Sequence, residues 1–190
     1  MTTALNVIAI AGSSYRPSRT LVLAEELLAQ LTRQLNADGR KVHGQVIELG
    51  SIARDVGGAL SRSELPAEVE TQLQAIENAD LLIVASPVYR GSYPGLLKHL
   101  FDLVEMNALI DTPVLLAATG GSERHALVID HQLRPLFSFF QALTLPIGVY
   151  ASESDFLNYQ VSNELLKARI QLAVERAVPL LANTPLKKIA

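Results

Sequence analysis

LNVIAIAGSS, residues 5–14, is an apolar and largely β-branched run that stops at a glycine and two serines. Because neither face of this run is polar, it is typical of a strand buried in a parallel sheet between two layers of helices. Four further short runs follow along the chain: Val42–Leu49, Leu81–Ser86, Pro113–Ala118 and Thr144–Tyr150. The first of these alternates in polarity as an edge strand does, and the last is weakened by a proline and a glycine.

Longer segments with apolar residues at helical spacing lie between these runs. We expect helices over Ser18–Leu35, Pro66–Asn78, Pro94–Met106, Glu123–Ala142 and Ser162–Leu181. Ile52–Leu65 is rich in small and polar residues, so we interpret it as a loop. The alternation of strand and helix predicts one α/β domain over residues 1–190, built on a doubly wound five-stranded parallel sheet with the flavodoxin-like order 2-1-3-4-5.

Composition narrows the functional classes. The chain has 190 residues, 49% of them hydrophobic, and 16 Lys+Arg against 19 Asp+Glu give a net charge of −3. A pI near 5.8 without a basic block argues against nucleic acid as a partner. The absence of cysteine excludes disulfides and thiolate nucleophiles, and fits a reducing cytoplasm. Ala4–Ala11 is apolar but no Lys or Arg precedes it, and no stretch reaches the roughly 18 residues of a membrane helix, so we expect a cytoplasmic protein without a membrane partner.

The loop after the first run has the composition of an anion site. GSSYRPSRT, residues 12–20, carries hydroxyls at Ser13, Ser14, Ser18 and Thr20, two arginines at Arg16 and Arg19, and no carboxylate. It leads into a helix N-terminus, where free N–H groups and the helix dipole favour an anion. Because the G-x-x-x-x-G-K-[ST] and G-x-G-x-x-G spacings are missing, the loop suits a phosphate monoester. The alternative is a serine-rich loop that merely caps a helix.

Two later loops belong to the same edge of the predicted sheet. SPVYRGSYPG, residues 86–95, offers Tyr89 and Tyr93 beside two glycines, so a planar heterocycle could lie there; the alternative is an ordinary turn. TGGSERH, residues 119–125, places Gly120-Gly121 after a buried run, which permits close approach of a ligand. Here the alternative is a strand-to-helix turn capped by Ser122.

Taken together, GSSYRPSRT, SPVYRGSYPGLLKHLFD and ATGGSERHALVIDHQLRP resemble the NAD(P)H-dependent FMN reductase family. The resemblance covers nearly the whole chain and is closest to the branch that supplies reduced FMN to sulfonate-cleaving monooxygenases. It implies that the first loop holds the FMN phosphate, the second lines the isoalloxazine and the third approaches its pyrimidine side. The residues so implied are Ser13, Ser18, Arg19 and Thr20, then Pro87, Val88, Tyr89 and Arg90, then Thr119, Gly120 and Gly121.

The chain departs from the family pattern at one position of the first loop. Many relatives carry arginine two residues after the serine that matches Ser13, whereas this chain has Tyr15 there and arginine one residue later. Either Arg16 or Arg19 could therefore meet the phosphate.

The resemblance also singles out His131 in VIDHQLRP. This position matches an extra residue that widens one helical turn in the sulfonate-linked branch, and inserted residues are the usual origin of π-bulges. The alternative is a regular helix with an exposed histidine. We expect His131 to tune flavin release or oligomer assembly and not to act as an acid.

The function implied is reduction of FMN by NADPH or NADH, with hydride passing from the nicotinamide C4 to the flavin N5. The cofactor carries that chemistry, so we expect binding residues, no catalytic side chain and no metal. Reduced FMN would then go to an FMNH2-dependent monooxygenase. Two alternatives share the fold: a quinone or azo reductase with FMN as a prosthetic group, and a flavodoxin-like electron carrier. Apolar faces on Pro94–Met106 and Glu123–Ala142 predict a homodimer or homotetramer.

Overall fold

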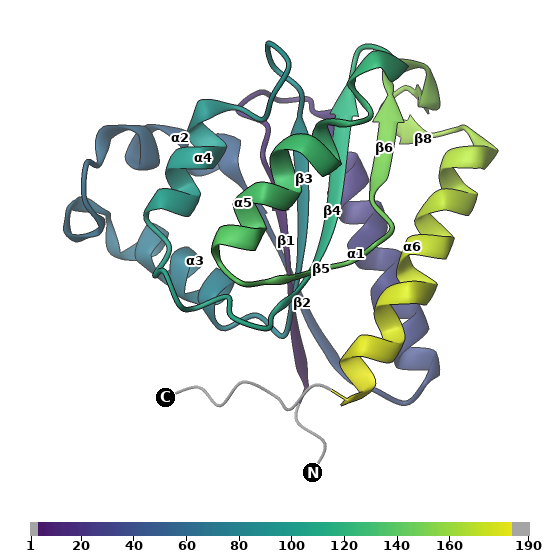
Figure 1. Ribbon diagram of the computed structural model, residues 1–190, viewed down its shortest axis with the longest axis horizontal. Helices are drawn as coiled ribbons and strands as arrows, with labels where there is room; N and C mark the ends of the chain where they lie inside the picture. Colours follow the sequence, from purple (N-terminus) through teal and green to yellow (C-terminus); the bar gives the residue numbers. More distant parts are fainter. Residues whose placement is uncertain (1–3, 184–190) are drawn as a thin grey trace.

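The computed structural model describes residues 4–183 and is built around one parallel sheet (Figure 1). Its strand order is β2-β1-β3-β4-β5, and β6 also pairs with β4. The strands of this sheet are β1 (Leu5–Ala11), β2 (Val42–Glu48), β3 (Leu81–Pro87), β4 (Pro113–Gly120), β5 (Leu143–Thr144) and β6 (Val149–Ser152). A separate antiparallel pair consists of β7 (Phe156–Leu157) and β8 (Gln160–Val161). The predicted flavodoxin-like order is confirmed.

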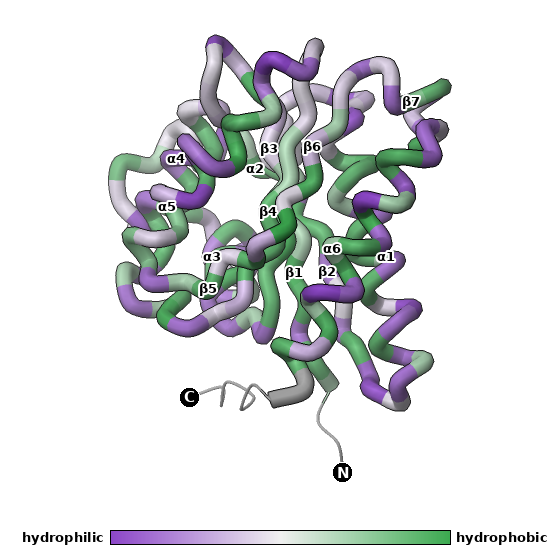
Figure 2. The backbone as a smooth tube through the Cα atoms, turned by 45° about the vertical axis from the view of Figure 1, so that its right-hand side comes forward, coloured by the Kyte–Doolittle hydropathy of each residue, from purple (hydrophilic) through white to green (hydrophobic). Residues whose placement is uncertain are grey.

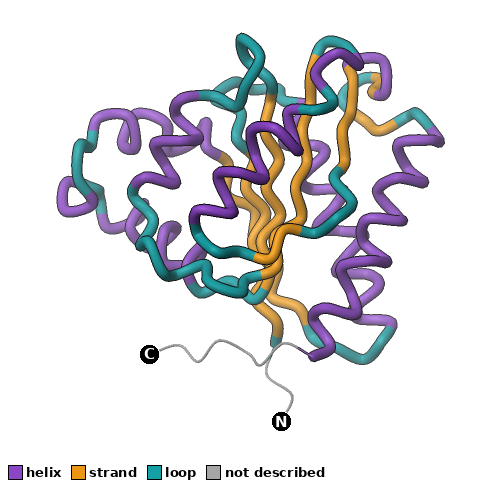
Figure 3. The backbone as a smooth tube through the Cα atoms, in the orientation of Figure 1, coloured by secondary structure: helices purple, strands orange, loops and turns teal. Residues whose placement is uncertain are grey.

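Helices cover both faces of the sheet (Figure 3). The α-helices are α1 (Arg19–Ala37), α2 (Leu49–Gly58), α3 (Ala67–Glu77), α4 (Gly95–Asp102), α5 (Arg134–Phe139) and α6 (Glu164–Asn183). Short 3-10 turns are η1 (Arg62–Glu64), η2 (Glu123–His125) and η4 (Glu153–Asp155), and η3 (Ile129–Leu133) is a π-helix. Helices α1 and α6 pack on one face, while α2 to α5 pack on the other.

The central strands are apolar because both of their faces are buried. In β1, Ile8 and Ile10 belong to the core beneath α2 to α5, whereas Val7 and Ala9 belong to the core beneath α1 and α6. All seven residues of β3 are buried. In Figure 2 the central strands are mainly hydrophobic, and the helices alternate between hydrophobic and hydrophilic residues. This is the pattern that a sheet covered on both sides requires.

The prediction that Ile52–Leu65 is a loop is wrong over its first half. Helix α2 occupies Leu49–Gly58, with Leu49, Ile52 and Val56 buried at helical spacing on one face. The small residues between these three apolar positions made the helical pattern hard to recognise in the sequence. Further along, the Arg62 guanidinium donates to the carboxylates of Glu70 and Glu77 on α3, so the segment after α2 is tied to the next helix.

The predicted fifth strand, Thr144–Tyr150, is split into β5 and β6, which pair with successive parts of β4. Between them, Pro146 has no N–H for the ladder. A Cβ at Gly148 would lie 2.7 Å from Ile129 Cγ2, so the chain passes close to η3 at this point. The second piece extends beyond the predicted end to Ser152.

The predicted long helix, Glu123–Ala142, is divided into η2, η3 and α5, and the predicted helix Pro94–Met106 ends at Asp102. The π-bulge expected at His131 is confirmed, since His131 is the middle residue of η3. The Arg134 N–H donates to the Ile129 carbonyl five residues earlier, which is the π-type bond. Regular α-helix continues only after this point, with Pro135 in its first turn, where a missing N–H is tolerated.

Candidate functional site

The loops after β1, β3 and β4 meet at the carboxyl end of the sheet, where open α/β sheets bind ligands (Figure 1). They enclose a cavity of about 270 Å³. Its lining includes ten predicted residues: Ser13, Ser18, Arg19, Thr20, Pro87, Val88, Tyr89, Thr119, Gly120 and Gly121. The fold therefore brings together residues more than a hundred positions apart, and leaves Arg16 and Arg90 outside this lining.

The first loop places buried hydroxyls at the start of α1. Ser18 caps the helix, since its Oγ accepts a hydrogen bond from the Leu21 N–H at 3.3 Å. Ser13 Oγ accepts from the Tyr15 N–H at 3.2 Å, which fixes a turn between two residues of the cavity lining. An added Cβ at Gly12 would lie 2.8 Å from Leu97 Cδ2 and 3.1 Å from the Ala85 carbonyl oxygen, so a larger residue would require its neighbours to shift. The loop thus presents hydroxyls and helix N–H groups to one spot.

A buried hydrogen bond joins the first loop to the third. Thr20 Oγ1 and Thr119 Oγ1 lie 2.7 Å apart, and both residues are buried. This contact links the first turn of α1 to the end of β4 beneath the cavity. The two loops are therefore fixed relative to each other.

The second loop forms a two-residue hairpin. Tyr89 and Ser92 exchange backbone hydrogen bonds of 2.8 and 3.2 Å. Arg90 and Gly91 both have positive φ, which is the type I′ geometry that suits such a turn. Arg90 is thereby carried to the exposed tip, away from the cavity. The Tyr89 ring stays at the rim, 6.2 Å from the ring of Tyr15 in an edge-on arrangement.

The third loop is closely fitted at Gly120 and open at Gly121. A Cβ at Gly120 would overlap the Tyr150 hydroxyl, whereas one at Gly121 would meet nothing within 4 Å. The Tyr150 hydroxyl donates to the Ser122 carbonyl at 2.6 Å. Burial raises the pKa of this hydroxyl, and the charges of Glu123 and Asp155 raise it further. Tyr150 therefore remains a neutral donor that holds the glycine turn in place.

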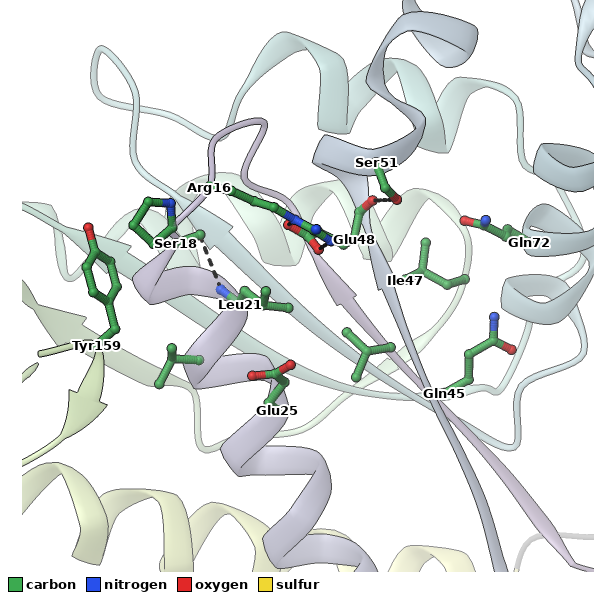
Figure 4. Close-up of a pocket in the computed structure, with 13 residues that line it drawn as sticks. Arg16, Ser18, Leu21, Glu25, Gln45, Ile47, Glu48, Ser51, Gln72 and Tyr159 are labelled. Atoms are coloured by element: carbon green, nitrogen blue, oxygen red, sulfur yellow. Dashed lines mark hydrogen bonds and ion pairs between the residues drawn. The ribbon is translucent and has the colours of Figure 1, made fainter.

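The two arginines of the first loop have different partners. Arg16 reaches back to the buried Glu48 carboxylate at the end of β2, and hydrogen bonding to Glu48 raises the pKa of the guanidinium (Figure 4). This pair lines a second groove of about 780 Å³ beside α1 and β2, which adjoins the cavity at Pro17 and Ser18. Arg19 instead lines the cavity between the three loops. Of the two candidates, Arg19 is the one that faces the site.

Besides Tyr15 and Pro17 of the first loop, sequence reasoning missed two lining residues where β6 passes into η4. Ser152 and Glu153 also line the cavity, and Glu153 forms an ion pair with Arg19. The available signal was Ser152-x-x-Asp155, because a serine three residues before an acidic residue marks a capped turn. The predicted strand ended at Tyr150, before this motif begins.

His131 is exposed on η3 and does not line the cavity. Its neighbour Gln132 accepts a hydrogen bond from the Ser92 hydroxyl at 3.0 Å. The π-helix is therefore connected to the hairpin that carries Tyr89.

Within residues 4–183, no three or more His, Asp or Glu side chains are grouped as metal ligands would be. None of the helices in the described part of the chain is long and apolar enough to cross a bilayer.

Comparison with known proteins identifies close relatives. Residues 5–156 match the family model described as NADPH-dependent FMN reductase. The chain is 68% identical to an NADH-dependent FMN reductase, SfnF, of Pseudomonas fluorescens, and 65% identical to an FMN reductase (NADPH) of Pseudomonas aeruginosa, over the full length of all three chains. A solved oxidoreductase structure from Corynebacterium diphtheriae superimposes with a TM-score of 0.87 at 32% identity, covering 96% of this chain and 100% of that one.

Proposed function

The chain belongs to the NADPH-dependent FMN reductase family, and from this membership we propose that the cavity between the three loops is its FMN site. The single observation that carries the proposal is the convergence of those loops, with their buried hydroxyls and Arg19, on one cavity at the switch point of the sheet.

The first loop fits a phosphate monoester. Ser13, Ser18 and Thr20 supply hydroxyls, and Arg19 supplies a positive charge. The first turn of α1 supplies backbone N–H groups besides that of Leu21, which Ser18 caps. A phosphate monoester offers several acceptor oxygens and about two negative charges, which match this set of donors. We assign Ser13, Ser18, Arg19 and Thr20 to the phosphate.

The second and third loops fit a flat ring system. Pro87, Val88 and Tyr89 form one wall, and Thr119, Gly120 and Gly121 form the other. The open space beside Gly121 leaves room for a ligand edge to approach the backbone. We assign these six residues to the isoalloxazine.

The activity is NAD(P)H-dependent reduction of FMN. Bound FMN supplies the ability to accept a hydride from NAD(P)H. The protein binds the phosphate, orients the ring between the two walls and leaves one side open to the reductant. Hydride transfer requires no acid or base from the chain, so we assign binding residues only.

We further propose that reduced FMN leaves this chain and serves an FMNH2-dependent monooxygenase that cleaves sulfonates. The π-helix at His131 supports this reading, because it is the feature through which the sequence resembles the sulfonate-linked branch. A quinone or azo reductase would instead retain FMN, and a flavodoxin-like carrier would not oxidise NAD(P)H.

Steady-state assays separate these possibilities. We expect purified protein to oxidise NADPH or NADH at a rate that saturates with added free FMN, and to carry well under one flavin per chain after gel filtration. Coupling to a sulfonate monooxygenase should yield sulfite. Stoichiometric bound FMN, with turnover independent of added FMN, would favour the quinone or azo reductase.

The phosphate assignment predicts a difference between FMN and riboflavin, which lacks the phosphate. Arg19→Ala should weaken FMN about tenfold to a hundredfold, because a charge-assisted contact is worth roughly 1.5–3 kcal/mol, and should leave riboflavin nearly unchanged. Ser18→Ala should act in the same direction. Fluorescence titration measures both affinities.

Arg33→Ala is the matched control, since Arg33 is an exposed arginine on the same helix. Arg16→Ala should affect FMN less than Arg19→Ala does, because Arg16 is held by Glu48. Equal weakening of FMN and riboflavin by Arg19→Ala would contradict the assignment.

A further inference from the structure

We propose that Glu153 competes with the FMN phosphate for Arg19 and thereby keeps FMN affinity low enough for release. This inference rests on the proposed placement of FMN in the cavity. It adds Glu153, which lies outside the three loops, to the residues that determine the affinity for FMN.

Glu153 and Arg19 face each other across the phosphate end of the cavity. Both residues line it, and the Arg19 Nη2 donates to Glu153 Oε1 in an ion pair. Within the described part of the chain, these are the two charged residues of that lining. Their charges cancel, so an incoming phosphate meets a cation that already has a carboxylate partner.

The fold holds the Glu153 backbone firmly. Glu153 begins η4, and Asp155 closes this turn by accepting hydrogen bonds from the Ser152 N–H at 2.7 Å and the Ser152 hydroxyl at 2.9 Å. Asp155 is buried and also accepts from Asn163 Nδ2 at 2.6 Å. The carboxylate of Glu153 is therefore presented from a turn fixed at the end of β6, not from a loose loop.

Arg19 has a second partner in the C-terminal part of the chain. The Tyr159 ring, on the turn between β7 and β8, lies 5.6 Å from Arg19 Cζ in a cation–π arrangement. Glu153 and Tyr159 together orient the guanidinium from the C-terminal half of the chain. Figure 4 shows Tyr159 beside the start of α1, near Ser18.

The solvent exposure of the pair allows exchange. The side chains of Arg19 and Glu153 are 39% and 62% exposed. Exposed ion pairs are weak, worth up to about fivefold in an equilibrium constant, so a phosphate with about two charges can displace the carboxylate. Glu153 then remains close to the bound phosphate as an unpaired like charge. Both effects raise the dissociation constant of FMN, and neither applies to riboflavin.

Glu153→Gln tests the proposal because it keeps the shape and removes the charge. We expect FMN to bind about three- to tenfold more tightly, with a lower KM for FMN, while riboflavin affinity stays constant. The gain should shrink in about 0.5 M salt, because screening weakens interactions between exposed charges. Glu26→Gln is the matched control, since the Glu26 side chain is 43% exposed and pairs with Arg33 on α1, so this change should alter neither affinity.

A double variant separates this proposal from the site assignment. In an Arg19→Ala background, Glu153→Gln should improve FMN affinity less than it does in the wild type, because the competition for Arg19 is gone. If Arg19→Ala weakens FMN selectively but Glu153→Gln leaves FMN affinity unchanged or lower, the competition is refuted and the phosphate site stands. If neither variant alters FMN affinity relative to riboflavin, both proposals fail.

Discussion

Arg16 and Arg19 stand three residues apart, yet the fold sends them to different carboxylates. Glu48 ends β2, whereas Glu153 begins η4, 134 positions beyond Arg19. The sequence correctly predicts a cationic, hydroxyl-rich loop here. It could not separate the two arginines, because their partners are fixed by strand order and by where each strand ends. Tertiary structure alone assigns Arg19 to the cavity.

At the residue scale, the close fit around Gly120 predicts that a larger side chain there lowers the free energy of unfolding. In Gly120→Ala the new Cβ would overlap the Tyr150 hydroxyl, so Tyr150 must shift and lose its bond to the Ser122 carbonyl. We expect a loss of about 1–3 kcal/mol in the free energy of unfolding, measured in urea, and weaker FMN binding.

Gly121→Ala supplies the comparison, because open space surrounds its Cβ and its stability should stay within about 0.5 kcal/mol of wild type. Tyr150→Phe should recover part of the loss in the Gly120→Ala background by removing the overlapping oxygen. If both alanine variants were equally stable, the close fit at Gly120 would contribute nothing measurable to the free energy of unfolding.

At the scale of elements, the length and hydrophobic period of each segment decided whether its predicted strand or helix was confirmed. Strands β1 and β3 are long apolar runs between breakers, and both are found nearly where predicted. Helix α2 was missed because its stripe of Leu49, Ile52 and Val56 is narrow and interrupted by glycines and polar residues. The split between β5 and β6 falls at Pro146 and Gly148, which mark the run as weak in the sequence. The close approach of Gly148 to Ile129 could not be predicted, because it joins separate segments.

The prediction at the scale of elements concerns the π-helix η3. Deleting His131 should restore a regular helical turn, because it removes the extra residue from the ring closed by the Arg134 N–H and the Ile129 carbonyl. The change would reach the Tyr89 hairpin through the bond between Ser92 and Gln132. We expect more FMN retained per purified chain and slower turnover of free FMN.

His131→Ala keeps the backbone residue, so it should change both quantities less than the deletion. Flavin absorbance per chain and NAD(P)H oxidation with added FMN measure the two effects. If the deletion variant folds and matches the wild type in both, η3 has no part in flavin release.

At the scale of the whole molecule, one groove has a mainly apolar lining, with Lys98 and Asp102 as its charged residues. Phe139 and Met106, which are 64% and 57% exposed, border this groove of about 460 Å³ beside α4 and α5. Phe101 and Leu136 form part of its floor. Exposed apolar patches of this kind mark interaction sites. We propose that a second copy of the chain covers this surface, giving a dimer or tetramer.

Light scattering tests this assembly. The wild type should have a mass of at least twice the 20.6 kDa of one chain at micromolar concentration. Phe139→Asp should shift it toward the monomer, because a carboxylate cannot be buried cheaply in an apolar interface. Leu165→Asp, on an exposed leucine of α6, should leave the mass unchanged. A wild-type monomer would refute the proposal.

The covering of β3 on both faces has a consequence for hydrogen exchange. We expect amides in the middle of the sheet to exchange only when the whole domain opens, because β3 is buried on both faces. The Tyr89–Ser92 turn and the β7–β8 pair are mostly exposed, so we expect their amides to exchange through local opening. Opening events near the cavity should therefore need only a small part of the total free energy of unfolding. We therefore expect the protein to bind and release its ligand many times while its β3 amides stay unexchanged.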